Sequence, residues 1–406
     1  MSVNEIVKAY AGPNGEKIRS DLVVRFEPGG RPLEMNVASK VEYLYREAIE
    51  AAVRRVVRAF GVTTGTLEVE DFGALEWVIL ARVETCLQRA GFRGEPVLPS
   101  PAPGADATRV RGRLRRSRLY VPGNQPKLMV SAGLYGADGI ILDLEDSVPP
   151  TDKDAARILV RNALAAMDFG SAERMVRINQ GELGTADLEA IAPYNVHTIL
   201  LPKVERPEDV AAIAGRLREL RGNDAPYLMP ILESPLGISN AYAIAAADRS
   251  VVALTLGLED LSAELGAPRT AEGWESFLAR QTTVYAARAA GVQPIASVFS
   301  DIRDGAGLEA YVRRERSLGF DGIGCIHPRQ IPVVHRAMAP TEVELAKALR
   351  IVRAAEEAQA NGLGAVAVGS KMVDPPVVAQ ARRTVELAAA AGMLDEEWEA
   401  DDAKQE

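Results

Sequence analysis

The first part of the chain alternates strand-like and helical patterns of hydrophobic and polar residues. Strand-like patterns cover residues 21–28 and 64–71, and helical patterns cover 40–61 and 73–91. The first of these helices has one apolar face, and such a face needs a sheet or a second helix to cover it. We therefore expect residues 1–95 to form a small α+β domain.

Residues 96–112 show no such pattern. This segment is rich in Pro, Ala and Gly and contains four prolines. A stretch of that composition without apolar periodicity is typical of an extended linker. We expect it to separate the first domain from the rest of the chain.

From residue 113 onward, short apolar runs alternate with helical stretches. Eight runs are strand candidates: 117–123, 139–146, 175–179, 198–204, 227–234, 251–260, 294–301 and 322–328. Eight evenly spaced β–α repeats predict an α/β fold, a closed (β/α)8 TIM-type barrel over residues 113–337. A doubly wound open sheet is the structural alternative, but the number and spacing of the repeats favour closure.

Residues 338–406 predict a C-terminal helical segment with an acidic tail. Helical patterns cover 342–362 and 375–392, and a loop is expected between them at 364–376. The last residues, from 395 to 406, are acidic and polar, which is typical of disorder.

Composition narrows the class of protein. A net charge of −9 argues against nucleic acid as the main partner. No apolar run is long enough for a membrane helix, and the N-terminus lacks a basic stretch followed by a hydrophobic one. The two cysteines, Cys86 and Cys325, lie too far apart in sequence to suggest a disulfide framework or a zinc site. We expect a cytoplasmic protein without membrane contact.

In a barrel of this kind the active site lies at the carboxyl ends of the strands. The ends of the predicted strands carry mostly acidic residues: Asp143, Glu145, Asp146, Arg177, Asn179, Lys203, Glu205, Glu233, Glu259, Asp260, Asp301 and His327. Carboxylates held close together repel one another, and a cation is the simplest way to hold them. Because the available ligands are oxygens, Mg²⁺ or Mn²⁺ is favoured over zinc. The alternative is a solvated rim with scattered charges.

Arg177 offers a planar fork for a carboxylate or an enolate oxygen. The alternative is a structural ion pair with Asp143, Glu145 and Asp146. The sequence lacks the glycine-rich phosphate loops of nucleotide-binding proteins and the Gly-x-Ser-x-Gly elbow of serine hydrolases. Nucleotide hydrolysis, dinucleotide redox chemistry and serine hydrolase chemistry are therefore disfavoured.

Seven motifs in the barrel region resemble the citrate lyase beta subunit, of the citrate lyase/malyl-CoA lyase aldolase superfamily. They are RSRLYVPGNQPKLM (116–129), GADGIILDLEDSV (136–148), VRIN (176–179), ILLPKVE (199–205), LESPLGI (232–238), LGLEDL (256–261) and CIHPRQI (325–331). The first 91 residues are similar to the citrate lyase gamma subunit, an acyl carrier protein. The matching pieces are AYAG (9–12), SDLVVRFEP (20–28) and VEDFGALEWVILARVE (69–84).

The resemblance implies a Mg²⁺ held by Glu233 and Asp260, with Glu233 also close to the substrate. It implies that Arg177 binds the substrate near its thioester oxygen. It further implies that Asp374, in the C-terminal segment, enters a neighbouring subunit's site as proton donor or acceptor. The implied assembly is a homotrimer or a multiple of it. On sequence alone, Asp374 is a loop aspartate followed by prolines.

The resemblance implies a phosphoribosyl-dephospho-coenzyme A arm on a serine in a short loop before the first strand. Here the loop is longer, residues 12–21, and Ser20 before Asp21 is the single candidate. Alignment on the aspartate would instead put Arg19 at the modified position. The alternative for Ser20 is a strand-capping serine in an unmodified domain that serves only architecture.

The sequence therefore predicts a Mg²⁺-dependent lyase that cleaves a citryl thioester, on a carrier protein or on coenzyme A, into oxaloacetate and an acetyl thioester. Arg177 would stabilise the enolate and Asp374 would protonate its carbon, whereas the base stays open among Asp143, Glu145 and Asp146. A citrate lyase would also need a separate alpha (transferase) subunit. The alternatives are a lyase for free malyl-CoA, citramalyl-CoA or citryl-CoA, a pyruvate-type class II aldolase, and an inactive carrier or scaffold subunit.

Overall fold

The computed structural model describes residues 5–15, 17–101, 108–360, 366–368 and 371–394. The chain forms two compact units. The first comprises Met1–Ser300 with Leu318–Pro328, and the second comprises Asp301–Ser317 with Arg329–Glu406.

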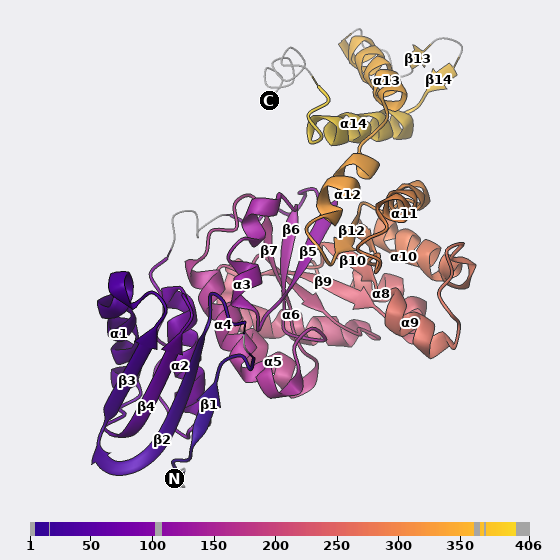
Figure 1. Ribbon diagram of the computed structural model, residues 1–406. Helices are drawn as coiled ribbons and strands as arrows, with labels where there is room; N and C mark the ends of the chain where they lie inside the picture. Colours follow the sequence, from indigo (N-terminus) through magenta and orange to yellow (C-terminus); the bar gives the residue numbers. More distant parts are fainter. Residues whose placement is uncertain (1–4, 16, 102–107, 361–365, 369–370, 395–406) are drawn as a thin grey trace. The chain divides into compact units, whose positions relative to one another are not determined.

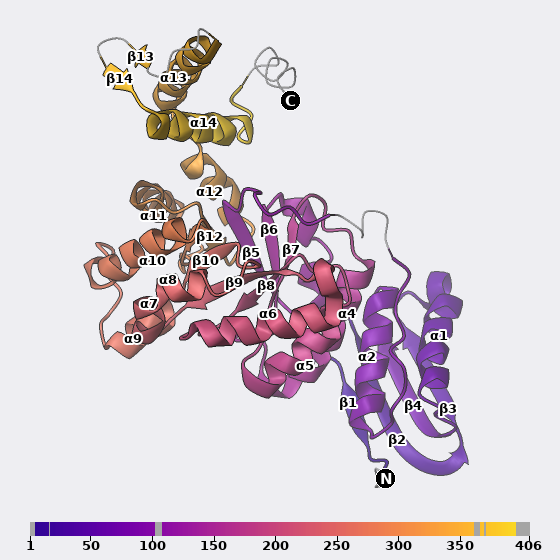
Figure 2. The same ribbon diagram turned by 180° about the vertical axis from the view of Figure 1, so that it is seen from behind.

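The first unit begins with a four-stranded sheet in the order β1-β2-β4-β3, made of β1 (Ala9–Ala11), β2 (Leu22–Pro32), β4 (Thr64–Asp71) and β3 (Glu34–Ser39). Strand β4 pairs antiparallel with β2 and parallel with β3. Helices α1 (Glu42–Ala59) and α2 (Glu76–Arg89) cover one face of this sheet (Figures 1 and 2). The α+β domain predicted from the sequence is confirmed. Strands β1 and β3 were not predicted, because β1 is short and β3 buries none of its side chains.

Helix α2 is buried on two sides. Every residue from Trp77 to Leu87 is buried, because the helix packs both on the small sheet and on α4 (Lys153–Ala166) of the following domain. Arg161 of α4 forms a two-pronged hydrogen bond with the buried Glu84 of α2, at 2.8 and 2.7 Å. Asn162 donates to the backbone oxygen of Trp77 at 3.1 Å. The small domain thus shares buried polar contacts with α4.

Eight parallel strands close into a barrel, so the prediction of closure over an open sheet is confirmed. They are β5 (Ser117–Pro122), β6 (Gly139–Asp143), β7 (Glu173–Arg177), β8 (Thr198–Leu201), β9 (Tyr227–Leu232), β10 (Ala253–Leu256), β11 (Gln293–Ala296) and β12 (Gly322–Cys325). Strand β12 pairs with β5 to close the ring. Apolar side chains from these strands fill the interior: Ile141, Met175, Leu200, Met229, Ile231, Ala253 and Ile295.

Helices follow the strands on the outside of the barrel (Figure 2). Besides α4 they are α3 (Pro126–Met129), α5 (Gly181–Ile191), α6 (Pro207–Arg221), α7 (Pro235–Ser239), α8 (Ala241–Ala245), α9 (Leu258–Leu265) and α10 (Phe277–Ala289). Single turns of 3₁₀ helix occur at Ala132–Tyr135, Pro150–Asp152, Gly222–Asp224 and Trp274–Ser276. Among the residues that the structure describes, none of the helices is long and apolar enough to cross a membrane.

The described parts of the predicted linker are held at both ends. Arg55 of α1 donates to the backbone oxygen of Leu98 at 2.9 Å. Arg109 donates to the backbone oxygen of Asn223 at 2.8 Å, and Arg111 to that of Arg249 at 2.7 Å. Residues 102–107 lie outside the described residues.

The second unit contains α11 (Gly305–Leu318), α12 (Gln330–Met338), α13 (Glu342–Ala360) and α14 (Pro375–Ala389). An apolar cluster joins α13 and α14: Leu345, Ala348, Ile351, Val352, Val373, Ala381, Val385 and Ala388. The loop predicted between these helices contains an antiparallel pair, β13 (Val366–Val368) and β14 (Lys371–Val373). The prediction of a loop was wrong there because each strand has three residues, fewer than a recognisable strand pattern needs. The predicted acidic tail lies outside the described residues.

Candidate active site

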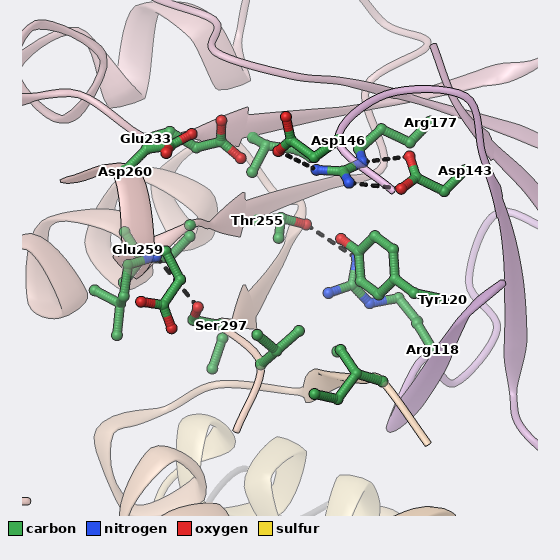
Figure 3. A pocket seen from close by; sticks show the side chains of 18 of the residues that line it. Arg118, Tyr120, Asp143, Asp146, Arg177, Glu233, Thr255, Glu259, Asp260 and Ser297 are labelled. Atoms are coloured by element: carbon green, nitrogen blue, oxygen red, sulfur yellow. Dashed lines mark hydrogen bonds and ion pairs between the residues drawn. The ribbon is translucent and has the colours of Figure 1, made fainter. Parts of the chain in front are cut away.

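A cavity of about 380 Å³ opens at the carboxyl ends of the barrel strands. Six residues predicted from the sequence line it together: Asp143, Asp146, Arg177, Glu233, Glu259 and Asp260. Arg177, Glu233 and Asp260 are the three proposed to bind metal or substrate. Each follows or ends a different strand, so closure of the barrel brings them to one place although they are far apart in the chain. Figure 3 shows their side chains around the cavity.

Arg177 ends β7 and is held by an acidic cluster. In the register of the sheet it lies opposite Asp143, the last residue of β6. Its Nε and Nη2 atoms each donate to an Asp143 carboxylate oxygen at 2.7 Å. Its Nη1 atom lies 2.9 Å from Glu145 and 3.5 Å from Asp146. The ion pair considered as an alternative from the sequence is therefore present, and the same arginine lines the cavity.

The pKa values of two acids in this cluster differ. Burial would raise the pKa of Asp143, but its hydrogen bonds with Arg177 outweigh burial and hold that pKa below its usual value. Burial raises the pKa of Glu145 to about 7, and the attraction of Arg177 offsets only part of this effect. Asp143 thus stays ionised, whereas Glu145 titrates near neutral pH.

Glu233 follows β9 and is buried, with 7% of its surface exposed. Its Oε2 atom has no hydrogen-bond partner among the described residues. Burial raises its pKa to about 7. A side chain at Gly257, in the LGLED motif, would place its Cβ 2.5 Å from the Glu233 Cγ and 2.8 Å from its Oε1. The glycine therefore leaves the space that this carboxylate occupies.

Asp260 lies in the first turn of α9, directly after β10. Its carboxylate is 3.1 Å from the Nζ atom of Lys203, and about half of its side chain is exposed (47%). The Asp260 charge contributes to the raised pKa of Glu233, and Figure 3 shows the two side chains next to each other. The two carboxylates thus share one side of the cavity.

The donor set fits a hard divalent cation. Burying a carboxylate oxygen without a partner costs free energy of folding. A cation bound beside it would displace the carboxyl proton and supply the missing partner. Mg²⁺ accepts oxygen ligands and usually keeps several water ligands, so two carboxylates suffice to hold it. Within the described ranges, no three His, Cys, Asp or Glu side chains gather as metal ligands. Glu233 and Asp260 therefore make a sparse site with positions left for substrate.

Among the cavity residues that the sequence did not predict are Arg118 and Tyr120 of β5. They alternate along the strand and thus point to the same side, into the barrel. The Arg118 side chain is fully buried, and the Tyr120 ring centre lies 5.3 Å from the Arg177 guanidinium carbon. The available signal was a charged and an aromatic residue two positions apart within SRLYVP, whereas the sequence-based search considered only strand ends.

Several predicted residues do not line the cavity, among them Glu145, Ser20 and Asp374. Ser20 belongs to the N-terminal domain, has a φ of 53°, and donates its backbone N–H to Phe72 at 3.1 Å. The neighbouring Asp21 is buried in a two-pronged hydrogen bond with Arg82. Asp374 belongs to the second unit, where it is exposed and directly precedes α14.

Two families match different parts of the chain. Residues 116–328 match the family described as HpcH/HpaI aldolase/citrate lyase. Residues 14–90 match the acyl carrier family described as malonate decarboxylase delta subunit (MdcD). The second match covers the small α+β domain, and supports its prediction as a carrier-like domain.

Individual proteins resemble the barrel part. The citrate lyase subunit beta of Leuconostoc mesenteroides subsp. cremoris is 38% identical over 296 residues, which cover 70% of this chain and 97% of that protein. The human mitochondrial citramalyl-CoA lyase is 35% identical over 290 residues, which cover 68% of this chain and 85% of that protein. The crystal structure of CitE from Mycobacterium tuberculosis with magnesium, acetoacetate and coenzyme A is 34% identical, with a TM-score of 0.57. The match covers 69% of this chain and 100% of CitE.

The barrel fold, the order of its motifs and these matches over most of the relatives' length agree with one another. The chain belongs to the HpcH/HpaI aldolase/citrate lyase family.

Proposed function

We propose that this protein is a Mg²⁺-dependent carbon–carbon lyase acting on the thioester of a hydroxy acid. Its leading substrate is a citryl thioester, cleaved to oxaloacetate and an acetyl thioester. One observation carries the proposal: the buried Glu233, whose Oε2 atom lacks a partner and whose pKa is raised to about 7, next to Asp260. The names of the relatives, citrate lyase subunit beta and citramalyl-CoA lyase, support the reaction class.

Glu233 and Asp260 would hold the cation, and the magnesium in the related CitE structure supports Mg²⁺, although Mn²⁺ suits the same ligands. When bound, the ion acts as a Lewis acid that polarises the substrate's oxygen atoms. Lys203 lies 3.1 Å from Asp260 and helps to orient this half-exposed carboxylate. Glu233 must lose its proton before it can act as a ligand.

Arg177 would receive the negative charge that develops on the thioester oxygen. Its hydrogen bonds with Asp143 fix the plane of the guanidinium and keep it cationic despite burial. A donor oriented before the reaction stabilises the transition state without a cost of reorganisation. The base stays open among Asp143, Glu145 and Asp146: the pKa of Glu145 is raised to about 7 by burial, but only Asp143 and Asp146 line the cavity.

Asp374 would supply the proton to the acetyl carbon from a neighbouring subunit of a homotrimer. Its exposed position at the start of α14 is compatible with that role. Mixing Asp374→Asn and Arg177→Lys proteins, each weakly active alone, should restore activity by subunit exchange. Failure of every mixture, with exchange demonstrated, would contradict a shared site.

Ser20 would carry a phosphoribosyl-dephospho-coenzyme A arm. Arg82 connects its surroundings to the barrel: it binds Asp21 and also donates to the backbone oxygen of Asn124 at 3.2 Å, in the loop that follows β5. That loop lies at the same end of the barrel as the cavity. Intact-protein mass spectrometry of the native protein, with peptide mapping of residues 12–28, should find the arm on Ser20. A chain with that arm would need a separate alpha subunit as its partner.

A lyase for free coenzyme A thioesters is the second candidate. The human relative is a citramalyl-CoA lyase, and the related CitE structure contains coenzyme A. An unmodified peptide 12–28 would favour this candidate and leave the N-terminal domain an architectural role.

The reaction class is tested with citryl-CoA and excess Mg²⁺, by following oxaloacetate release. The wild type should be active, and both EDTA and the Asp260→Asn substitution should abolish most of the activity. Glu264→Gln is the matched control, since Glu264 is exposed on the same helix, one turn away. Equal activity of Asp260→Asn and Glu264→Gln, or activity that survives EDTA, would overturn the proposal.

A further inference from the structure

Among the described residues, one cation inside the barrel, Arg118, hydrogen-bonds to no carboxylate. The side chain of Arg118 is 0% exposed. Its Nη1 atom donates to Thr255 Oγ1 at 3.1 Å and lies 3.0 Å from the Met229 sulfur. Its Nε and Nη2 atoms have no hydrogen-bond partner anywhere in the described part of the chain. A buried charge of this kind is costly unless an anion accompanies it.

Two glycines pair with Arg118 in the sheet, so no side chains project from the positions beside it. In the sheet register, Arg118 pairs with Gly139 of β6 and with Gly324 of β12. A Cβ at Gly139 would lie 3.1 Å from the end of Met175, and a Cβ at Gly324 would lie 3.1 Å from the Tyr120 ring. Side chains at these positions would therefore crowd the residues that surround the guanidinium.

Arg118 lines the same cavity as Glu233, Asp260 and Arg177. It lies deeper in the barrel than Arg177, because it comes four residues before the end of its strand whereas Arg177 is the last residue of β7. Tyr120, two residues further along β5, lines the same part of the cavity, and Figure 3 shows both side chains. Since Arg118 is fully buried, a ligand would reach it only when a lining side chain such as Tyr120 turns aside.

The candidate substrates differ in the third group on the carbon that bears the hydroxyl. This group is a hydrogen in a malyl thioester, a methyl in a citramalyl thioester and a carboxymethyl in a citryl thioester. The keto acids released are glyoxylate, pyruvate and oxaloacetate respectively. Only the citryl group, or the oxaloacetate made from it, brings a further carboxylate into the cavity.

We propose that Arg118 binds this further carboxylate and so selects citryl over citramalyl and malyl thioesters. The inference rests on the lyase function proposed above and assigns its substrate class. Two free N–H donors of one guanidinium match the two oxygens of a carboxylate, which is the strongest hydrogen-bonding arrangement available to an arginine. A site with unpaired buried donors also disfavours an uncharged analogue that cannot satisfy them.

The test measures the binding of oxaloacetate, pyruvate and glyoxylate, each with Mg²⁺, to the wild type, Arg118→Met and Arg118→Lys by calorimetry. The wild type should bind oxaloacetate at least about tenfold more tightly than pyruvate. Arg118→Met should lose about 100-fold in oxaloacetate affinity and change pyruvate affinity less than twofold. Arg118→Lys should recover part of the loss, because it keeps a cation. In the same variants, kcat/KM for citryl-CoA relative to citramalyl-CoA should follow the binding ratio.

The outcomes separate the two proposals. Wild-type binding of pyruvate as tight as that of oxaloacetate, or an equal loss of both ligands in Arg118→Met, would overturn the role of Arg118 and leave the lyase intact. If the wild type binds none of the three acids and cleaves none of the three thioesters, the lyase proposal fails and this one with it. Should both variants fail to fold, the wild-type affinities test the proposed substrate class. Tighter binding of oxaloacetate than of pyruvate would support a citryl substrate, and equal binding would overturn it.

Discussion

Two regions of the molecule use buried arginines differently. At the contact between the small domain and the barrel, Arg161 meets Glu84 in a two-pronged hydrogen bond, and Arg82 meets Asp21 in the same way. Inside the barrel, the hydrogen-bond partners of Arg118 among the described residues are a hydroxyl and a thioether. In the first region each arginine has a carboxylate partner, whereas in the second the described residues give Arg118 none. The difference separates charges that hold the architecture from a charge kept for a ligand.

Buried glutamates show the same contrast. Glu173, at the start of β7, accepts hydrogen bonds from Arg115 at 2.7 and 2.8 Å and from Thr198 at 2.6 Å. Glu233, after the end of β9, leaves Oε2 without a partner among the described residues, and its pKa is raised to about 7. Both are buried, so burial alone does not distinguish them. What distinguishes them is whether the chain satisfies the carboxylate.

The largest effect is expected from Glu233→Gln. This substitution removes a proposed metal ligand, and a metal's Lewis-acid contribution of several kcal/mol corresponds to a fall in kcat of roughly 1000-fold. The thermal stability of the metal-free protein should not fall, because an unpartnered buried carboxylate is removed. Steady-state kinetics and calorimetric unfolding of the same sample measure both effects. A variant that is less stable than the wild type but has an unchanged kcat would contradict this prediction. Glu233 would then be an architectural carboxylate like Glu173.

Breaking the pair between the small domain and the barrel should cost stability. Arg161→Met leaves Glu84 buried without its partner, with an expected loss of about 3–5 kcal/mol in the free energy of unfolding. Arg118→Met should cost nothing or stabilise the protein, because it removes a lone buried cation. Urea unfolding of both variants tests the comparison directly. Equal losses in the two variants would mean that Arg118 is an architectural charge like Arg161.

Sequence patterns predicted the barrel well because buried parallel strands appear as short apolar runs, and the residues after them must reach one face. Arg177, Glu233 and Asp260 were found on that basis. Arg118 could not be found in this way, since it lies within a strand. Its lack of a partner also depends on Met229 and Thr255, which are 111 and 137 residues away in the chain.

The small domain was predicted less completely than the barrel. Its two long helices and the strands β2 and β4 carry clear patterns, but β3 owes its place to pairing with β4 and not to buried side chains. The contact between α2 and α4 was also not predicted. A sequence shows that Glu84 and Arg161 are charged, but it does not show that they meet.

Mg²⁺ affinity should depend on pH with a defined sign. The pKa of Glu233 is raised from 4.5 to about 7 by burial, so protons compete with the metal below that value. We expect affinity to fall about tenfold for each pH unit below about 7 and to level off above it. Calorimetric titrations between pH 5.5 and 8.5 measure this. An affinity that does not change over this range would contradict the raised pKa.

The same raised pKa predicts how stability varies with pH. In the metal-free protein, the folded state holds the Glu233 proton more tightly than the unfolded state does. Its stabilising contribution is therefore present below about 4.5 and is lost as the pH rises to about 7. Glu145 acts in the same direction, because its pKa is also raised to about 7. Glu233→Gln should abolish the Glu233 contribution to this pH dependence of stability. Saturating Mg²⁺ should abolish the same contribution in the wild type.

The smallest effect is expected at Ser20. Its φ of 53° is the left-handed conformation that glycine adopts without cost. Ser20→Gly should change the unfolding free energy by no more than about 1 kcal/mol, while it removes the site proposed for the arm. Thermal unfolding measures the first effect and mass spectrometry the second. A much larger loss of stability would favour an architectural role for Ser20.

Glu233, with its unpartnered Oε2 atom, and Asp260 are proposed to hold a divalent cation. A calorimetric titration of Mg²⁺ at pH 8, with oxaloacetate present, tests this proposal most directly in the wild type and in Glu233→Gln. We expect one saturable Mg²⁺ site per chain in the wild type and its loss in the variant. Equal binding by both proteins, or no Mg²⁺ binding by the wild type, would contradict it.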